Sequence, residues 1–125
     1  MRYLHTRLKV RDMERAIAFY TTHLGCELRR RSTSPRGTQL AFLKLPGVDA
    51  DLELAYLPWD PDFQLAEDIV HLAFQVPDMT TTLERMREAG VTITEEPAKG
   101  SSGMMAFIED PDGYEIELLD YSPSR

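Results

Sequence analysis

The sequence predicts an α+β fold made of two copies of a β-α-β-β-β unit. Three observations lead to this prediction. Residues 5–13 align without a gap on residues 71–79, with His, Val, Asp and Met identical at matching positions. Each of these segments passes from an alternating strand pattern into a helix start. Each half then ends in a strand that carries a Glu between apolar residues, Glu53 in the first half and Glu117 in the second.

The last two strands form the most strongly patterned element, a hairpin over residues 107–121. Its turn over residues 110–113 reads Asp-Pro-Asp-Gly, in which Pro fixes one φ angle and Gly accepts a positive one. In the strand that follows, alternation places Tyr114 and Ile116 on one face and Glu117 on the other. If helices cover the apolar face, Glu117 points to the opposite side of the sheet.

The other elements of the first half follow in chain order. Residues 3–10 alternate as a strand with His5 on its polar face. Asp12 is a helix N-cap, and apolar residues repeat at helical spacing from there until Gly25 ends the helix. Three further strands are predicted at residues 27–33, 39–45 and 52–57, separated by turns that contain Pro and Gly.

The second half repeats this order after a linker over residues 58–68 that begins with Pro-Trp-Asp-Pro. We expect a strand at residues 69–76, a helix from the cap Asp78 to Gly90, and strands at residues 91–94, 104–108 and 114–121. Residues 95–103 are predicted to be a flexible loop, and residues 122–125 a frayed tail. The chain is thus expected to be one domain, residues 1–125, with modules over about 1–57 and 69–121.

Length and composition restrict the class of protein. A chain of 125 residues is the size of one domain. No apolar run reaches the ~18 residues of a membrane span, and the first residues lack a signal peptide's apolar core, which predicts a cytoplasmic protein without a membrane partner. The single cysteine, Cys26, excludes a disulfide framework and a thiolate metal site. The net charge of -7 argues against nucleic acid as a partner.

Four side chains suited to metal binding occupy matched positions in the two halves: His5 and Glu53 in the first, His71 and Glu117 in the second. Two imidazoles and two carboxylates without a thiolate suit a divalent ion such as Zn, Ni or Co, with positions left for water. A single His or Glu on a strand is more often structural or solvated. Because these four recur at matched positions of a duplicated unit, the sequence favours a metal site.

The sequence resembles the glyoxalase I (lactoylglutathione lyase) family of the vicinal oxygen chelate superfamily. The resemblance rests on His5, the helix over residues 12–25, Glu53, His71 and the segment over residues 109–118, and it covers nearly the whole chain. The Glu-Asp-Pro-Asp-Gly-Tyr run in that last segment is shared across the superfamily. The His, Glu, His, Glu quartet is the more specific part, since other members replace one ligand or use three.

This resemblance implies an open, cupped eight-stranded mixed sheet and a homodimer with its sites between subunits. His5 and Glu53 of one subunit would meet His71 and Glu117 of the other around one Ni, Co or Zn ion. The substrate would be the hemithioacetal of methylglyoxal and glutathione, and the product S-lactoylglutathione, as in methylglyoxal detoxification. The metal would stabilise an enediolate while a carboxylate moves the proton. Glu117 is the expected catalytic base, with Glu53 as a ligand and second candidate base.

Binding of glutathione, which has two carboxylates, requires local positive charge in an acidic protein. Lys9 occupies the place where the family has a carboxylate-binding Arg, and Lys99 matches another basic contact. Arg7 shares the His5 face of the first strand, where it is either a third substrate contact or an exposed strand residue. Trp59, in the linker, is either a fourth substrate contact or a loop anchor.

Two positions depart from the family pattern. Leu57 stands where the family has an Asn that contacts glutathione, and Val70 where a Gly commonly precedes the second His. The change at Leu57 concerns the thiol and leaves the metal ligands intact. The alternatives are another metalloenzyme of the superfamily, such as an epimerase, isomerase or thiol transferase acting on a different substrate, and a metal-free module that binds a small hydrophobic ligand. Retention of all four ligands argues against the binding module.

Overall fold

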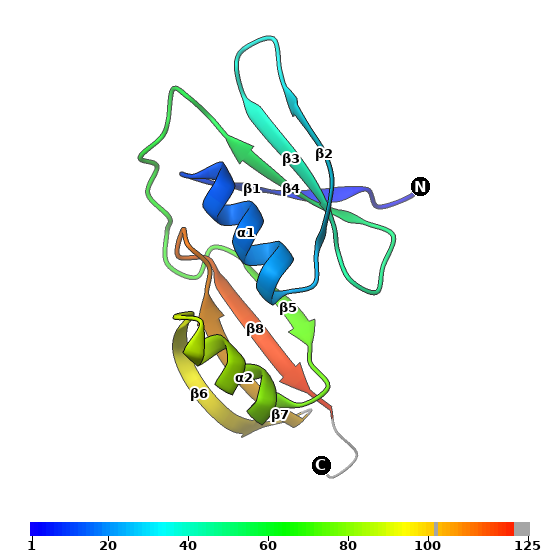
Figure 1. Cartoon of the computed structure of the whole chain (residues 1–125), viewed down its shortest axis with the longest axis vertical. Coiled ribbons are helices and arrows are strands. Elements are labelled where there is room, and N and C mark those ends of the chain that lie inside the picture. Colours follow the sequence, from blue (N-terminus) through cyan, green and yellow to red (C-terminus); the bar gives the residue numbers. More distant parts are fainter. Residues whose placement is uncertain (102, 122–125) are drawn as a thin grey trace. The chain divides into compact units, whose positions relative to one another are not determined.

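The computed structural model describes residues 1–101 and 103–121, and its secondary structure repeats β-α-β-β-β twice (Figure 1). The first repeat consists of β1 (His5–Lys9), α1 (Met13–His23), β2 (Glu27–Thr33), β3 (Gln39–Lys44) and β4 (Asp51–Tyr56). The second consists of β5 (His71–Gln75), α2 (Met79–Glu88), β6 (Thr92–Gly100), β7 (Gly103–Glu109) and β8 (Glu115–Asp120). The tail expected over residues 122–125 lies outside the described residues.

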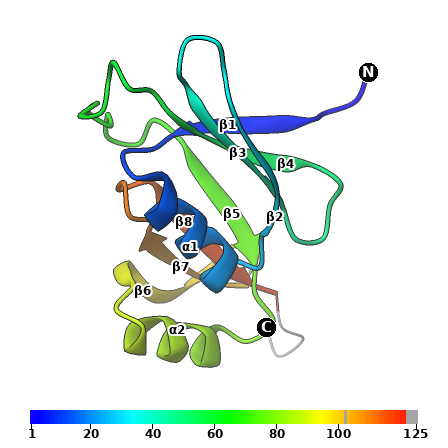
Figure 2. The same ribbon diagram turned by 45° about the horizontal axis from the view of Figure 1, so that its top comes forward.

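The chain divides into two compact units, Met1–Gln64 and Leu65–Arg125, and each contains one four-stranded mixed sheet. The strand order is β1-β4-β3-β2 in the first sheet and β5-β8-β7-β6 in the second. β1 pairs with β4 and β5 with β8 in parallel, whereas the other pairs are antiparallel. α1 packs on the first sheet and α2 on the second (Figures 1 and 2). The predicted α+β class and the duplicated order of elements are confirmed.

Both helices begin with the same cap, as the sequence predicts. Asp12 has φ −143° and ψ 106°, Asp78 has φ −151° and ψ 106°, and each side chain accepts a hydrogen bond from the backbone N–H three residues later. This bond satisfies one of the N–H groups that a helix start leaves unpaired. Beyond the first helix, Gly25 adopts a φ of 71°, a left-handed conformation that only glycine reaches without strain.

The predicted hairpin between β7 and β8 is present, and its turn is held by Asp110. The carbonyl of Asp110 accepts from the Gly113 N–H at 3.1 Å, and its side-chain Oδ1 accepts from the N–H groups of Asp112 and Tyr114 at 2.9 Å each. Apolar side chains of β8, such as Ile116, are fully buried. Because side chains alternate along a strand, this register directs Glu117 to the other face of the sheet.

The prediction of a flexible loop over residues 95–103 is wrong. β6 continues to Gly100 and β7 begins at Gly103, so most of this segment lies in the sheet. β6 is the outermost strand of its sheet, and its pairing with β7 shifts register between Glu95 and Ala98, around Pro97. A proline lacks an N–H for the ladder, but an edge strand with a bulge tolerates it.

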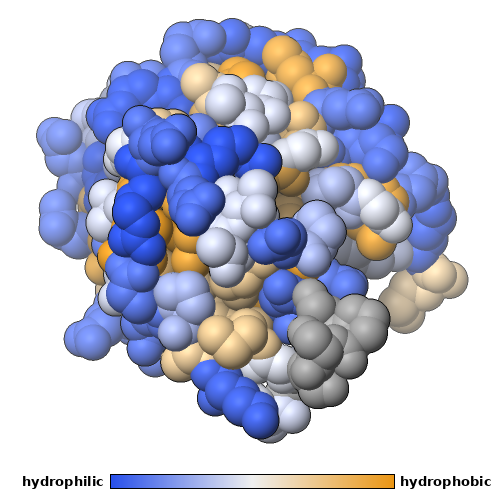
Figure 3. All heavy atoms as spheres, turned by 60° about the horizontal axis from the view of Figure 1, so that its bottom comes forward, coloured by the Kyte–Doolittle hydropathy of each residue, from blue (hydrophilic) through white to orange (hydrophobic). Residues whose placement is uncertain are grey.

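Large apolar side chains are exposed just before the first strand of each unit. Tyr3 and Leu4 precede β1, and Ile69 and Val70 precede β5. β1 and β5 are also the outermost strands of their sheets on that side. Figure 3 shows apolar atoms at the surface between hydrophilic side chains on the face drawn. No helix in the described ranges, 1–101 and 103–121, has the length and apolar character needed to cross a membrane.

Candidate active site

The first unit brings His5 and Glu53 together from two neighbouring strands. β1 and β4 run parallel with His5 opposite Asp51, so that Glu53 follows two residues later on the same face. The His5 Nε2 atom lies 3.8 Å from Glu53 Oε2. The Glu53 side chain is only 5% exposed, whereas His5 is 41% exposed. The pair therefore presents an accessible imidazole beside a buried carboxylate.

The second unit repeats this arrangement with His71 and Glu117. β5 and β8 run parallel with His71 opposite Glu115, the same register as in the first unit. The His71 Nε2 atom lies 3.2 Å from Glu117 Oε1. The Glu117 side chain is 17% exposed and His71 43% exposed. Each unit thus contributes one imidazole and one carboxylate from equivalent positions.

Each histidine ring packs edge-on against a phenylalanine that sequence analysis did not identify as part of the site. The centres of the His5 and Phe42 rings are 5.9 Å apart, and those of His71 and Phe107 are 5.7 Å apart, with interplanar angles of 78° and 81°. These contacts hold each imidazole beside its carboxylate. The sequence signal for them is an Ala-Phe pair repeated at residues 41–42 and 106–107.

The donor set of each unit fits half of a divalent metal site. Imidazole nitrogens and carboxylate oxygens are ligands of Zn, Ni and Co, and four such groups leave coordination positions for water or substrate. Nowhere in residues 1–101 or 103–121 do three or more His, Cys, Asp or Glu side chains cluster so as to hold a metal ion.

Three of the four predicted substrate contacts, Arg7, Lys9 and Trp59, each contact another side chain of this chain. The Arg7 Nε atom donates to Glu53 Oε1. The Lys9 Nζ atom donates to Asp60 Oδ2 at 2.7 Å, next to the ring of Phe63 at 5.1 Å.

Trp59 and Lys99 are the two remaining candidates. Trp59 is half exposed, and the guanidinium carbon of Arg36 lies 4.5 Å from its ring centre, so it anchors the loop after β4 to the β2–β3 turn. Lys99 is exposed on β6, opposite Met104. The roles of both residues in substrate binding remain predictions.

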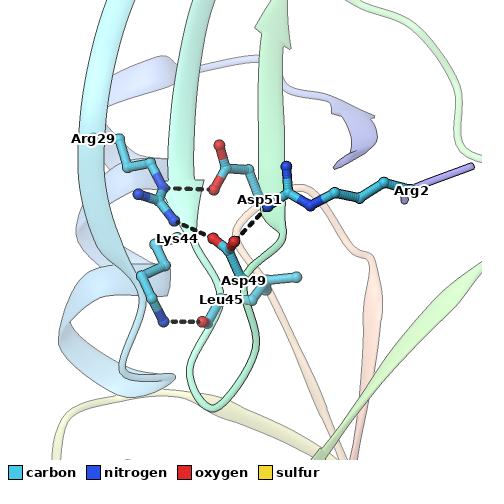
Figure 4. A network of polar contacts seen from close by, with 6 residues as sticks. All are labelled: Arg2, Arg29, Lys44, Leu45, Asp49 and Asp51. Atoms are coloured by element: carbon cyan, nitrogen blue, oxygen red, sulfur yellow. Dashed lines mark hydrogen bonds and ion pairs between the residues drawn. The ribbon is translucent and has the colours of Figure 1, made fainter. Parts of the chain in front are cut away.

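Beside His5, an open cavity of about 420 Å³ is bordered by a network of ion pairs. Arg29 on β2 contacts Asp51 at 2.7 Å and Asp49 at 3.3 Å, and Arg2 also contacts Asp49 (Figure 4). The network joins β2, the β3–β4 turn and the segment before β1. Sequence spacing did not indicate it, because its members come together only when the strands pair.

Cys26 is a buried free thiol that is not one of the candidate metal-binding or substrate-binding residues. Burial raises the pKa of its thiol from 9.0 to about 11, although the charge of Lys44 acts in the opposite direction. Because the thiolate is the reactive form, we expect a maleimide at pH 8 to modify the folded protein on the order of 100-fold more slowly than the unfolded chain. Timed quenching and mass spectrometry measure both rates, and equal rates would mean that Cys26 is accessible.

The chain is similar to known proteins in both sequence and fold. The family model described as Glyoxalase/Bleomycin resistance protein/Dioxygenase superfamily matches residues 2–118. The lactoylglutathione lyase of Salmonella typhimurium is 41% identical over 96% of this chain and 93% of its own length. The trypanothione-dependent glyoxalase I of Leishmania major has a TM-score of 0.83 and 38% identity, covering 97% of this chain and 87% of that one. TnmS3, an antibiotic-binding protein from Streptomyces sp. CB03234, has a TM-score of 0.76 and 25% identity, covering 98% and 97%.

Proposed function

Because this chain belongs to the glyoxalase/bleomycin resistance protein/dioxygenase superfamily, we propose that it is a lactoylglutathione lyase acting in methylglyoxal detoxification. Such an enzyme converts the hemithioacetal of methylglyoxal and glutathione into S-lactoylglutathione. The observation that supports this function best is the His–Glu pair found at the same strand register in both units. A metal-free binding module has no need of two such pairs.

His5, Glu53, His71 and Glu117 are the residues that would hold the metal. When bound, a divalent ion supplies Lewis acidity, which stabilises negative charge on the substrate oxygens. The two imidazoles are neutral donors, and the two carboxylates balance the charge of a divalent ion. Phe42 restricts the His5 ring, and thereby fixes the direction in which its nitrogen points.

Glu117 is the residue that we assign to proton transfer. The reaction takes a proton from one substrate carbon and returns a proton to its neighbour, so one carboxylate acts first as base and then as acid. Glu117 is more accessible than Glu53 and has no Arg on its oxygens among the residues described. Glu53 is buried, which suits a ligand held in a fixed position better than a group that must accept and release a proton.

We further propose that the complete site forms between two copies of the chain. Each unit provides one imidazole and one carboxylate, so a site with four ligands combines the pairs of two units. The exposed apolar residues before β1 and β5 would be covered by such an association, since large exposed apolar patches mark interaction sites. A homodimer then contains two sites, each built from the first unit of one subunit and the second unit of the other.

The identity of the thiol is a separate question. Leu57 replaces the expected Asn, and Lys9 is engaged by Asp60, so the expected glutathione contacts are altered. The Leishmania major relative is described as trypanothione-dependent, which makes that thiol the second substrate to test. The binding-module alternative has its counterpart in the antibiotic-binding TnmS3. The cytoplasmic location remains a prediction.

The test of this function is formation of S-lactoylglutathione from methylglyoxal and glutathione. Purified protein is treated with a chelator and then supplied separately with Ni, Co or Zn. We expect loss of activity on chelation and its return with at least one metal, because the donor set accepts all three. Tight metal binding without turnover would move the search to trypanothione and other thiols. Absence of both binding and turnover would support the metal-free module.

A further inference from the structure

Side chains in one cross-strand row surround Glu53 in the first unit. Arg7 on β1 and Phe42 on β3 are its neighbours on either side, and Arg30 on β2 follows Phe42. Residues paired across a sheet point to the same face, so the four side chains form one row. The Arg30 guanidinium carbon lies 4.0 Å from the Phe42 ring centre, and Arg7 contacts Glu53 directly. Two positive charges therefore flank this half-site.

The equivalent row of the second unit has the opposite charge. Ala73 stands in the place of Arg7 beside Glu117, followed by Phe107 and then Glu95. The register shift before Glu95 matches the shift before Arg30, so the rows correspond residue by residue. The two units thus share the His, Phe and Glu but differ in the charges around them.

The two oxygens of Glu53 have different neighbours. Oε1 accepts from Arg7 Nε, while Oε2 lies on the side of His5, 3.8 Å from its Nε2. The side chain is 5% exposed, and a carboxylate so buried is strongly destabilising unless an opposite charge compensates it. His5 is too far for a hydrogen bond, so Arg7 supplies that compensation in the metal-free chain.

We propose that Arg7 is an internal counter-ion that occupies Glu53 when no metal is bound. It keeps the first half-site folded in the absence of metal, and it lowers the affinity of the complete site for a divalent cation. The inference rests on the proposed metal site and concerns a residue that the proposed reaction does not itself require. A guanidinium and a dication near the same carboxylate repel each other. The presence of Arg7 therefore makes the free energy of metal binding less favourable.

The Arg7→Met variant tests this, because Met keeps much of the side-chain length and removes the charge. Metal affinity is measured with Zn alone, by competition with a chromophoric chelator, and thermal unfolding is followed with and without Zn. We expect the variant to bind Zn about tenfold more tightly than the wild type does. This factor corresponds to the repulsion between a unit charge and a dication at ~6 Å even in water. We expect the metal-free variant to melt roughly 3–8 °C below the metal-free wild type. With Zn bound, the difference between the two melting temperatures should become much smaller.

Three further variants are controls. Arg31→Met breaks an exposed ion pair with Glu14 at 2.7 Å and should change neither the Zn affinity nor the benefit of Zn in thermal unfolding. Arg7→Lys retains the charge and should restore most of the wild-type behaviour. Ala73→Arg places a guanidinium beside Glu117 at an exposed position. The added guanidinium should weaken Zn binding about tenfold by the same repulsion. If Arg7→Met does not fold, Ala73→Arg is the variant that tests this repulsion.

The outcomes separate this inference from the proposed function. A wild-type protein that binds no Zn, Ni or Co overturns both. If wild type binds metal but Arg7→Met binds Zn with unchanged or weaker affinity, the counter-ion role is wrong and the proposed function stands. A melting temperature lowered equally with and without Zn would make the Arg7–Glu53 pair purely structural, which also overturns the inference.

Discussion

Replacing Glu117 by Gln is expected to lower kcat by roughly 10²–10⁴-fold while leaving most of the bound metal in place. The amide oxygen still offers a neutral donor at the position of the carboxylate, but an amide does not accept the substrate proton. Initial rates of S-lactoylglutathione formation give the turnover, and elemental analysis of the dialysed protein gives the metal content. Both are measured on the same preparation.

The matched control is Glu84→Gln, the same chemical change at an exposed position on α2. It should leave both turnover and metal content at the wild-type level. If Glu117→Gln retained near-normal turnover, the proton-transfer role would belong elsewhere, and Glu53 would be the next residue to replace. If the metal were lost together with turnover, Glu117 would be established only as a ligand.

Mixing two inactive variants, His5→Ala and His71→Ala, is expected to restore activity. If each site combines the first unit of one subunit with the second unit of the other, a mixed dimer has one site in which both altered histidines meet and one site with four unaltered ligands. Random association of equal amounts makes half of the dimers mixed, so about a quarter of wild-type activity should return.

The control mixture is His71→Ala with Glu117→Gln, because both changes lie in the second unit. Every site in that mixed dimer contains one altered residue, so no activity should return. The chains are exchanged by unfolding and refolding the mixture together, and mixed dimers are isolated with two different affinity tags. Failure of the His5→Ala and His71→Ala pair to recover, with mixed dimers present, would place each site within one chain.

The fold could be predicted largely because its elements depend on neighbours in sequence. Asp12 and Asp78 cap helices through bonds to residues three positions later, and Asp110 closes a turn of four residues. Such interactions require particular residue types at short, fixed spacings, which can be recognised in the sequence. The exception is β6, where Pro97 and two glycines suggested a loop. Position at the edge of a sheet, which only pairing with β7 establishes, makes the proline tolerable.

The candidate ligands could also be predicted, because duplication repeats them. His5 and His71 occupy the same position in aligned segments. Within each unit, the register of the parallel strand pair then places the Glu on the same face as the His. Their neighbours could not be predicted. The contact between Arg7 and Glu53 joins residues 46 positions apart, and the one between Lys9 and Asp60 joins residues 51 apart.

Local patterns along the chain were sufficient to predict the two β-α-β-β-β units, the face of each strand that carries a His or Glu, and the kinds of metal-binding side chain present. Only the folded chain shows which charges lie beside those side chains and how far each is buried. The Glu53 side chain is 5% exposed and contacts Arg7, whereas the Glu117 side chain is 17% exposed. The two groups of properties differ in the sequence distance over which they act. Periodicity and turn chemistry act between neighbours in the chain, whereas burial and ion pairing depend on strands that meet only after the sheet has formed.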